Sequence, residues 1–284
     1  STSVAITYTT GTDAGSGLNT SNGRILRQSA TLSDGSCGGY GSWSEIVEES
    51  DGSYTDTTVS SGNCYVYRYE IFDNVMNGVN YTSASEAMVD TTTPTCTVLA
   101  INQTVGGGYQ YVSGKILYYN TLGSGNYTIN ISSASTVAGI HNITYPDTTG
   151  TGIVDTLSPY YHEYNFSTDD IFDNNATIFC YANSGRVSNT SVNITQDITA
   201  PSGGSISYTD GFATTSQITF GDGSDSESGV NASNTRLFRR DATILDNNTC
   251  GNFGSWSQIE SEDPTSAYTD AKVSGGNCYQ YIYE

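Results

Sequence analysis

The chain contains an internal repeat, and this repeat limits the possible folds more than any other feature. Residues 1–70 recur at residues 213–284. For example, Cys-Gly-Gly-Tyr-Gly-Ser-Trp-Ser at residues 37–44 returns as Cys-Gly-Asn-Phe-Gly-Ser-Trp-Ser at residues 250–257. The offset between the copies drifts only from 212 to 214 residues, so short loop insertions are enough to explain it. A repeat of this kind indicates a structural unit that is used more than once.

Two proline junctions bound the segment between the copies. They are Asp-Thr-Thr-Thr-Pro at residues 90–94 and Asp-Ile-Thr-Ala-Pro at residues 197–201. Proline fixes its own φ and keeps the preceding residue extended, so each junction predicts a stiff, strand-like link. The sequence therefore predicts three domains: residues 1–90 and 198–284 of one type, type A, and residues 91–197 of a second type, type B.

Each type A domain lacks a part that the other one has. Residues 1–90 have no equivalent of residues 201–212, and residues 198–284 have no equivalent of residues 71–89. Two explanations are open. Either the sequence is a window on a longer repetitive chain, which we favour, or a neighbouring subunit donates the missing edge strand. The first residue, Ser1, predicts a mature or excised fragment.

Alternating residues and a turn-rich composition predict an all-β fold. Residues 65–71 place three tyrosines and Ile71 on one face of an extended strand. Residues 177–181 and 189–195 predict further strands in the type B domain. The chain has 31 glycines and 22 tyrosines but few strong helix formers. Domains of roughly 100 residues with short alternating strands indicate tandem immunoglobulin-like β-sandwiches in an extended array.

Six cysteines fall as one pair in each predicted domain. The pairs are Cys37 with Cys64, Cys96 with Cys180, and Cys250 with Cys278. An even count with this distribution predicts disulfides inside each domain, although no second copy supports the type B pair. No cysteine spacing predicts a zinc site. Disulfides indicate an oxidising, extracellular or cell-surface location.

Acceptor sequences for N-glycosylation, Asn-x-Ser/Thr, are frequent. Residues 91–197 hold eleven asparagines, and eight of them begin an acceptor sequence, where chance predicts roughly three at this Ser and Thr content. The sequence therefore predicts covalent N-glycans; the alternative is coincidence in a chain rich in Ser, Thr and Asn. The twelve acceptor asparagines are Asn19, Asn80, Asn102, Asn126, Asn130, Asn142, Asn165, Asn175, Asn189, Asn193, Asn231 and Asn247.

Trp43 and Trp256 occupy equivalent positions, each after Gly-Ser. An exposed tryptophan can stack on a sugar ring, whereas a buried one anchors a core. We expect both residues to be core anchors, because this is the commoner role.

The net charge argues against a nucleic-acid partner, and the length of the apolar runs argues against a membrane span. The formal net charge is −20, and Lys115 and Lys272 are the only lysines, which argues against nucleic acid because phosphate binding needs clustered cations. No apolar run is long enough to predict a membrane span in this sequence.

The sequence predicts no enzyme, metal site or cofactor. Its only histidines, His141 and His162, belong to no zinc motif, and neither type A domain has a histidine for a Ser-His-Asp arrangement. Acidic pairs at residues 48–49 and 169–170 are typical of solvated surface. One acidic loop, which contains Asp222, Asp225 and Glu227, could supply calcium ligands. The equivalent loop of the first copy retains only one of these three acids.

Several stretches resemble the tandem immunoglobulin-like modules, of the bacterial type, found in large microbial cell-surface proteins. In type A they are residues 11–18, 36–38, 62–69, 73–74 and 90–94, and in type B residues 117–120 and 158–160. The resemblance covers essentially the whole chain. It implies a spacer, stalk, fibre or adhesin. One departure is at residues 75–77, Val-Met-Asn, where similar modules have Gly-Asn, so an altered turn is expected there.

Together these observations predict a structural component of a glycosylated extracellular filament or surface stalk built from tandem immunoglobulin-like repeats. Its partners would be its own N-glycans and further repeats, either in the same chain or in identical subunits. The alternative is an adhesin or receptor fragment whose modules bind a ligand or display a ligand-binding region. A third hypothesis is a non-catalytic module of a surface enzyme.

Overall fold

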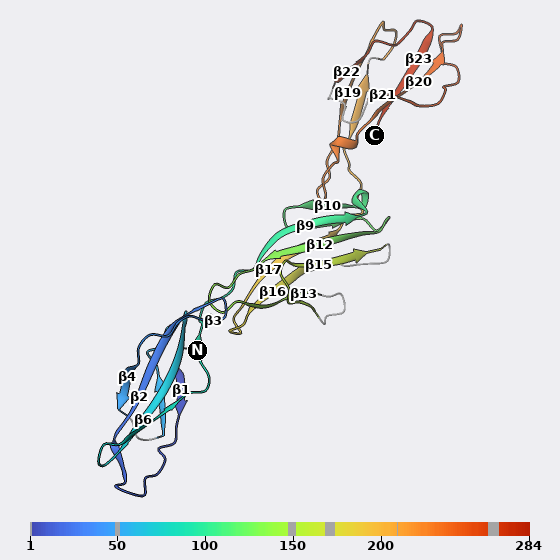
Figure 1. Cartoon of the computed structure of the whole chain (residues 1–284). Helices are drawn as coiled ribbons and strands as arrows, with labels where there is room; N and C mark the ends of the chain where they lie inside the picture. The colour runs from blue at the N-terminus through green and yellow to red at the C-terminus, as the bar shows by residue number, and fades with distance from the viewer. Residues whose placement is uncertain (1, 49–51, 147–151, 168–173, 209, 261–266) are drawn as a thin grey trace. The chain divides into compact units, whose positions relative to one another are not determined.

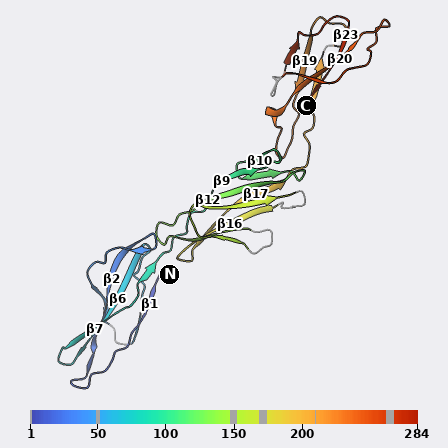
Figure 2. The ribbon, with the colours of Figure 1, turned by 45° about the vertical axis from the view of Figure 1, so that its right-hand side comes forward.

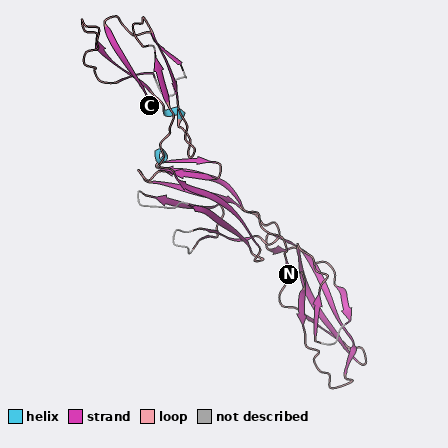
Figure 3. Cartoon of the chain, turned by 180° about the vertical axis from the view of Figure 1, so that it is seen from behind, coloured by secondary structure: helices cyan, strands magenta, loops and turns pink. Residues whose placement is uncertain are grey.

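The computed structural model describes residues 2–48, 52–146, 152–167, 174–208, 210–260 and 267–284. Contacts divide the chain into two compact units, each described by itself: Ser1–Leu117 with Thr121–Thr195, and Tyr118–Asn120 with Gln196–Glu284. For description, residues 1–90 are called the first A segment, residues 91–197 the B segment and residues 198–284 the second A segment. Among the described residues the only helical elements are two short turns, Gly107–Tyr109 and Ala232–Asn234. Figure 3 shows that almost all regular structure is strand.

The B segment forms two sheets with a core between them (Figure 1). One sheet has the strand order β15-β12-β9, and the other has the order β10-β11-β17-β16-β13-β14. In the letters used for immunoglobulin-like sandwiches, these sheets are E-B-A and G-F-C-C′, with the β10–β11 hairpin added beside strand G. The bounds are β9 (Thr97–Val105), β10 (Gln110–Ser113), β11 (Ile116–Tyr119), β12 (Gly125–Ser132), β13 (Ile140–Tyr145), β14 (Ile153–Asp155), β15 (Tyr160–Phe166), β16 (Asn174–Ala182) and β17 (Val187–Gln196).

The described residues of the first A segment have the same plan without a strand A. Strands β1 and β5 form one sheet and correspond to strands B and E. The other sheet has the order β3-β2-β6-β7, and Figure 2 labels β2, β6 and β7 of this sheet. Strand β4 pairs with β2 and β8 pairs with β6, so β7 and β8 together take the place of strand G. The bounds are β1 (Val4–Thr7), β2 (Leu18–Ser33), β3 (Ser36–Cys37), β4 (Ser44–Glu48), β5 (Ser53–Asp56), β6 (Asn63–Asp73), β7 (Gly78–Thr82) and β8 (Ala87–Val89).

The second A segment has a strand A, and its described residues contain no strand G. One sheet has the order β18-β19-β22, which corresponds to A-B-E, and the other has the order β21-β20-β23, which corresponds to C′-C-F. The bounds are β18 (Ser205–Tyr208), β19 (Ser216–Gly221), β20 (Leu237–Thr243), β21 (Ser257–Glu260), β22 (Ala267–Asp270) and β23 (Asn277–Tyr283). The predicted all-β, immunoglobulin-like sandwich fold is confirmed.

The alternation of residues 65–71 has the predicted effect. Tyr65, Tyr67, Tyr69 and Ile71 are buried in one core, which Ile25 of β2 completes. Their neighbours on β6 point to the other face of the sheet because side chains alternate along a strand.

The turn after β6 accommodates the unusual Val-Met-Asn sequence by backbone strain. Met76 has φ 70°, a conformation that favours glycine. The Asp73 carboxylate holds the turn by accepting hydrogen bonds from the backbone N–H groups of Val75 (2.9 Å) and Asn77 (2.8 Å).

Candidate functional site

All twelve predicted glycosylation sites are accessible to some degree. None of these asparagines is buried. Asn19, Asn126, Asn130 and Asn142 are partly exposed, and the other eight are exposed: Asn80, Asn102, Asn165, Asn175, Asn189, Asn193, Asn231 and Asn247.

Strand geometry explains how the B segment holds acceptor sequences inside a folded sheet. In Asn126-Tyr127-Thr128 the asparagine and threonine lie on the outer face of β12, and Tyr127 between them is only 4% exposed. Because side chains alternate, the acceptor pair points to solvent while the middle residue fills the core. The same pattern recurs around a buried middle residue at Ile131, Ile143, Phe166, Ala176, Thr190 and Ile194.

The acceptor asparagines form cross-strand pairs on both outer faces of the B segment. Asn126 of β12 lies directly opposite Asn165 of β15. On the other sheet, Asn175 of β16 lies directly opposite Asn193 of β17. Directly opposed side chains have Cβ atoms about 5 Å apart. Glycans on these residues would therefore stand side by side on each sheet.

Each A segment contains a buried aspartate that its sequence did not reveal as important. Asp56 has no exposed surface, and its carboxylate accepts hydrogen bonds from Arg27 Nη1 at 2.7 Å, the Tyr67 hydroxyl at 3.0 Å and the Thr58 backbone at 2.9 Å. Equivalent bonds join Asp270 to Arg239 at 2.8 Å and Tyr281 at 3.1 Å. The hydrogen bonds of each aspartate connect the two sheets, because the aspartate lies on strand E and its arginine and tyrosine partners lie on strands C and F. The only available clue was the recurrence of all three residue types in both copies.

The junction aspartates are also buried. Asp90 Oδ1 accepts hydrogen bonds from the Thr92 N–H at 2.9 Å and the Thr92 hydroxyl at 2.6 Å. Asp197 accepts from the N–H groups of Thr199 at 3.1 Å and Ser228 at 3.0 Å. The Asp-x-Thr pattern before each proline thus caps the turn that leads into the next segment.

We expect these aspartates to make the chain sensitive to acid. Burial raises the pKa of Asp56, but hydrogen bonds from Thr58 and Arg27 outweigh burial and hold the pKa below its usual value. Hydrogen bonds from Thr92 and Ser228 likewise outweigh burial and lower the pKa of Asp90 and Asp197, respectively. A carboxyl group of this kind adds stability above its unfolded pKa of about 3.9 and loses it as the pH falls through its folded pKa.

The measurement is urea unfolding followed by tyrosine fluorescence at about pH 6 and about pH 3. The midpoint should fall at the lower pH. An equal midpoint at both values would mean that these carboxyl groups titrate alike in the folded and unfolded chain.

The prediction that both tryptophans are core anchors was wrong. Trp256 is 39% exposed and Trp43 is only half-buried. Each packs on a guanidinium on the outer face of a sheet, with Arg68 4.3 Å from the Trp43 ring centroid and Arg240 4.5 Å from that of Trp256. The Gly-rich loop before each tryptophan follows the edge of strand C: the Gly41 N–H donates to the Ser29 carbonyl at 3.1 Å, and the Gly254 N–H donates to the Asp241 carbonyl at 3.0 Å.

Three disulfides join Cys37 to Cys64, Cys96 to Cys180, and Cys250 to Cys278. Each lies within one segment. The first and third have sequence separations of 27 and 28 residues, and the second, in the B segment, has a separation of 84 residues.

The described residues contain no group of three His, Cys, Asp or Glu that could hold a metal ion. His162 packs on aromatic rings, with its ring 4.7 Å from that of Tyr164. In the acidic loop, Asp225 is used locally, because its Oδ1 accepts backbone hydrogen bonds from Glu227 at 2.8 Å and Gly229 at 3.0 Å. Of the acidic pairs, residues 49, 169 and 170 lie outside the described residues.

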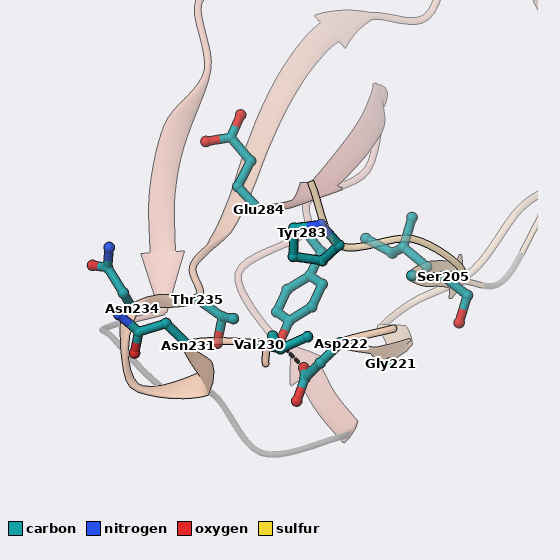
Figure 4. A pocket seen from close by; sticks show the side chains of 12 residues that line it. Ser205, Gly221, Asp222, Val230, Asn231, Asn234, Thr235, Tyr283 and Glu284 are labelled. Atoms are coloured by element: carbon teal, nitrogen blue, oxygen red, sulfur yellow. Dashed lines mark hydrogen bonds between the residues drawn. The ribbon is translucent and has the colours of Figure 1, made fainter. Parts of the chain in front are cut away.

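One cavity of about 470 Å³ lies at an end of the second A segment (Figure 4). Its wall includes Asp222, Val230, Asn231, Tyr283 and Glu284. The Tyr283 hydroxyl donates a hydrogen bond to Asp222 across the cavity wall. The lining holds two carboxylates, Asp222 and Glu284, beside the apolar side chains of Pro201, Ile206 and Val230. In the described part of the chain, no helix is long and apolar enough to cross a membrane.

The strand order and the paired sheets define the chain as tandem immunoglobulin-like β-sandwich modules. No protein-family model and no curated protein matches the sequence. Among solved structures, the chain is similar to fibronectin(III)-like modules of CbhA from Clostridium thermocellum, with 12% identity over 68% of this chain and 86% of that one and a TM-score of 0.33. It is similar to domains A168–A170 of titin, with 11% identity over 93% and 87% and a TM-score of 0.33. A tetra-tandem repeat from the extending region of a large adhesion protein has 13% identity over 94% and 64% and a TM-score of 0.24.

Proposed function

We propose that this chain is a structural component of a glycosylated extracellular filament or surface stalk, and that residues 1–90, 91–197 and 198–284 are its successive domains. The observation that carries the proposal is the placement of acceptor asparagines on both outer faces of the B segment. A sandwich with both faces coated in sugar has little surface left for a broad protein ligand. A coat of this kind suits a durable, protease-resistant spacer.

Covalent and backbone links support the same role. One disulfide cross-links each segment, and these disulfides fit an oxidising location outside the cytoplasm. The β2–β3 hairpin tip donates backbone hydrogen bonds from Asp34 to Thr136 (3.2 Å) and from Gly35 to Val137 (2.9 Å). These bonds and the capped turn at Asp90 restrain the passage from the first A segment into the B segment.

Glycopeptide mass spectrometry of the protein from its native source tests the sugar coat. We expect glycans on members of both cross-strand pairs, Asn126 with Asn165 and Asn175 with Asn193. The variant Thr128→Ala should lose the glycan at Asn126 and stay folded, because Thr128 lies on the outer face. Its control, Thr128→Ser, should keep the glycan. Unmodified asparagines at all four paired positions would overturn the proposal.

Electron microscopy tests the filament itself. Fibres whose structural repeat corresponds to the 212–214-residue offset between the copies would agree with a structural role. Isolated particles, or hydrolase activity on polysaccharide or peptide, would contradict it.

The adhesin alternative has one observation in its favour. Trp256 is exposed, and Phe253 and Trp256 both pack on the Arg240 guanidinium, at 5.1 and 4.5 Å from their ring centroids, which makes a small aromatic surface. If this surface binds a ligand, Trp256→Ala should abolish adhesion without changing fibre formation or stability by more than about 1–2 kcal/mol.

A further inference from the structure

Two acceptor triplets of the B segment lie in strands that are paired on both sides. Asn126-Tyr127-Thr128 belongs to β12, which pairs with β15 on one side and with β9 on the other. Asn142-Ile143-Thr144 belongs to β13, which pairs with β14 and with β16. A strand without a free edge offers no backbone groups to a further polypeptide. An enzyme that modifies either asparagine would therefore have to open paired strands before it could enclose the triplet.

The fold also engages the side chains of both asparagines. Asn126 Nδ2, the atom to which a sugar would be joined, donates a hydrogen bond to Glu163 Oε1 of β15 at 3.2 Å. Asn142 Oδ1 is a buried atom that has no hydrogen-bond partner in the described part of the chain. Both asparagines are only partly exposed, so the closed sheets hold the two amides in place.

The B-segment disulfide fixes this closed state. Cys180 of β16 lies directly opposite Ile143, the middle residue of the second triplet. Its partner Cys96 directly precedes β9, which pairs with β12. The bond therefore connects the two strands that flank the triplets, and both triplets lie inside the loop that it closes. Oxidation of this cysteine pair should make both triplets harder to reach.

A third triplet that also ends in threonine lies outside the strands. Asn247-Asn248-Thr249 belongs to the turn after β20, and all three residues are exposed. Asn247 Oδ1 accepts hydrogen bonds from the Thr249 N–H at 3.1 Å and from the Thr249 hydroxyl at 2.6 Å. Both bonds use the amide oxygen and not the nitrogen that would carry the sugar. This triplet is therefore presented to solvent in the folded segment.

The transfer of a sugar to asparagine makes one bond and breaks one. The new bond joins Nδ2 to C1 of the sugar, and the broken bond joins C1 to the phosphate oxygen of an activated donor. The phosphate leaves with the bonding electron pair, and Nδ2 gives up one proton to a basic group of the transferase. The reacting atoms must first approach to about 3–3.5 Å. The exposed turn at Asn247 permits this approach, whereas the closed strands oppose it.

We propose that sugar is transferred to Asn126 and Asn142 before the sheets of the B segment close, whereas Asn247 remains an acceptor on the folded chain. The donor is a sugar linked through C1 to a phosphate leaving group. The Cys96–Cys180 disulfide forms after the transfer, so the fold itself sets the order of the two reactions. The inference rests on the proposed function, because it concerns the attachment of the same sugar coat.

The test uses the full chain made in a host without N-glycosylation. One sample is folded with its disulfides, and the other is reduced and diluted from urea directly into the reaction. Both receive an oligosaccharyltransferase and a sugar donor linked to polyprenyl pyrophosphate, and glycopeptide mass spectrometry gives the occupancy of each site. Relative to Asn247, the occupancy of Asn126 and Asn142 should be lower by about tenfold or more in the folded sample, because paired central strands open rarely.

Synthetic peptides separate the effect of folding from the quality of each triplet. Peptides of residues 122–132 and 138–146 carry the two strand triplets without a sheet, and a peptide of residues 243–253 carries the turn triplet. We expect the first two peptides to be modified at least as well as the third.

Three results would overturn the inference. They are equal relative occupancy in the folded and unfolded samples, an unmodified Asn247 in the folded sample, and a failure of the peptides with Asn126 or Asn142 to accept sugar. Glycopeptide analysis of the native protein shows whether the sugar coat exists, whereas the occupancy ratio shows when sugar can be attached. A failure of the proposed order is therefore distinguishable from a failure of the proposed function.

Discussion

Removing the B-segment disulfide with the double variant Cys96→Ala/Cys180→Ala should lower the free energy of unfolding of that segment by about 4.5 kcal/mol. The bond closes a loop with a sequence separation of 84 residues. A cross-link restricts the unfolded chain more when the loop is longer, and the chain-entropy relation gives about 4.5 kcal/mol for a loop of this length. Hydrogen exchange of amides in β12 and β13 under increasing urea measures the loss.

The matched control is Cys37→Ala/Cys64→Ala in the first A segment. Its loop has a sequence separation of 27 residues, so the same relation gives about 3.5 kcal/mol. A loss below about 1 kcal/mol in the B segment, or a larger loss for the shorter loop, would show that the disulfides do not act through the unfolded chain.

The second large effect is expected for Asp56→Ala, which should destabilise the first A segment by about 3–5 kcal/mol. The substitution leaves the Arg27 guanidinium and the Tyr67 hydroxyl partly buried without their shared acceptor. Asp270→Ala should have a similar effect on the second A segment, because its partners are equivalent.

An exposed ion pair in the same A segment supplies the control. Glu45 lies 3.4 Å from Arg24, and both side chains are solvent-exposed, so Glu45→Ala should cost no more than about 1 kcal/mol. Urea unfolding of the three variants at neutral pH gives the comparison. Equal, small losses for Asp56→Ala and Glu45→Ala would mean that the buried network adds nothing to stability.

The sequence predicted the sandwich fold because its two main signals are local and repeated. Alternation at residues 65–71 indicated which side of β6 faces the core. The recurrence at residues 213–284 showed that one unit is used twice. The pairing of the strands into A-B-E and C′-C-F sheets was not visible in the sequence, because it depends on contacts between distant residues.

The tryptophans and the buried aspartates show where sequence reasoning failed. Residue type suggested a buried Trp256, which is 39% exposed, and nothing in the sequence singled out Asp270, which is fully buried. In each case a side chain from another strand determines whether the residue is exposed or buried. Arg240 holds the Trp256 ring against the outer face, and Arg239 with Tyr281 satisfies the Asp270 carboxylate in the interior.

The acceptor asparagines were identifiable one by one, but their arrangement was not. The pattern Asn-x-Thr itself fits a half-buried strand, because its first and third residues share a face. Which asparagines stand opposite each other depends on the register between β12 and β15 and between β16 and β17.

The two tryptophans pack on guanidinium groups that come from different strands in the two copies. Arg68, under Trp43, comes from β6, whereas Arg240, under Trp256, comes from β20. The equivalent positions hold Ile282 and Gln28, so neither copy has both arginines. A crossover between the repeats within residues 29–67 would yield one hybrid with two guanidinium groups beside its tryptophan and another with none. The hybrid without a guanidinium group would lose a cation–π contact worth about 0.5–1 kcal/mol at its tryptophan.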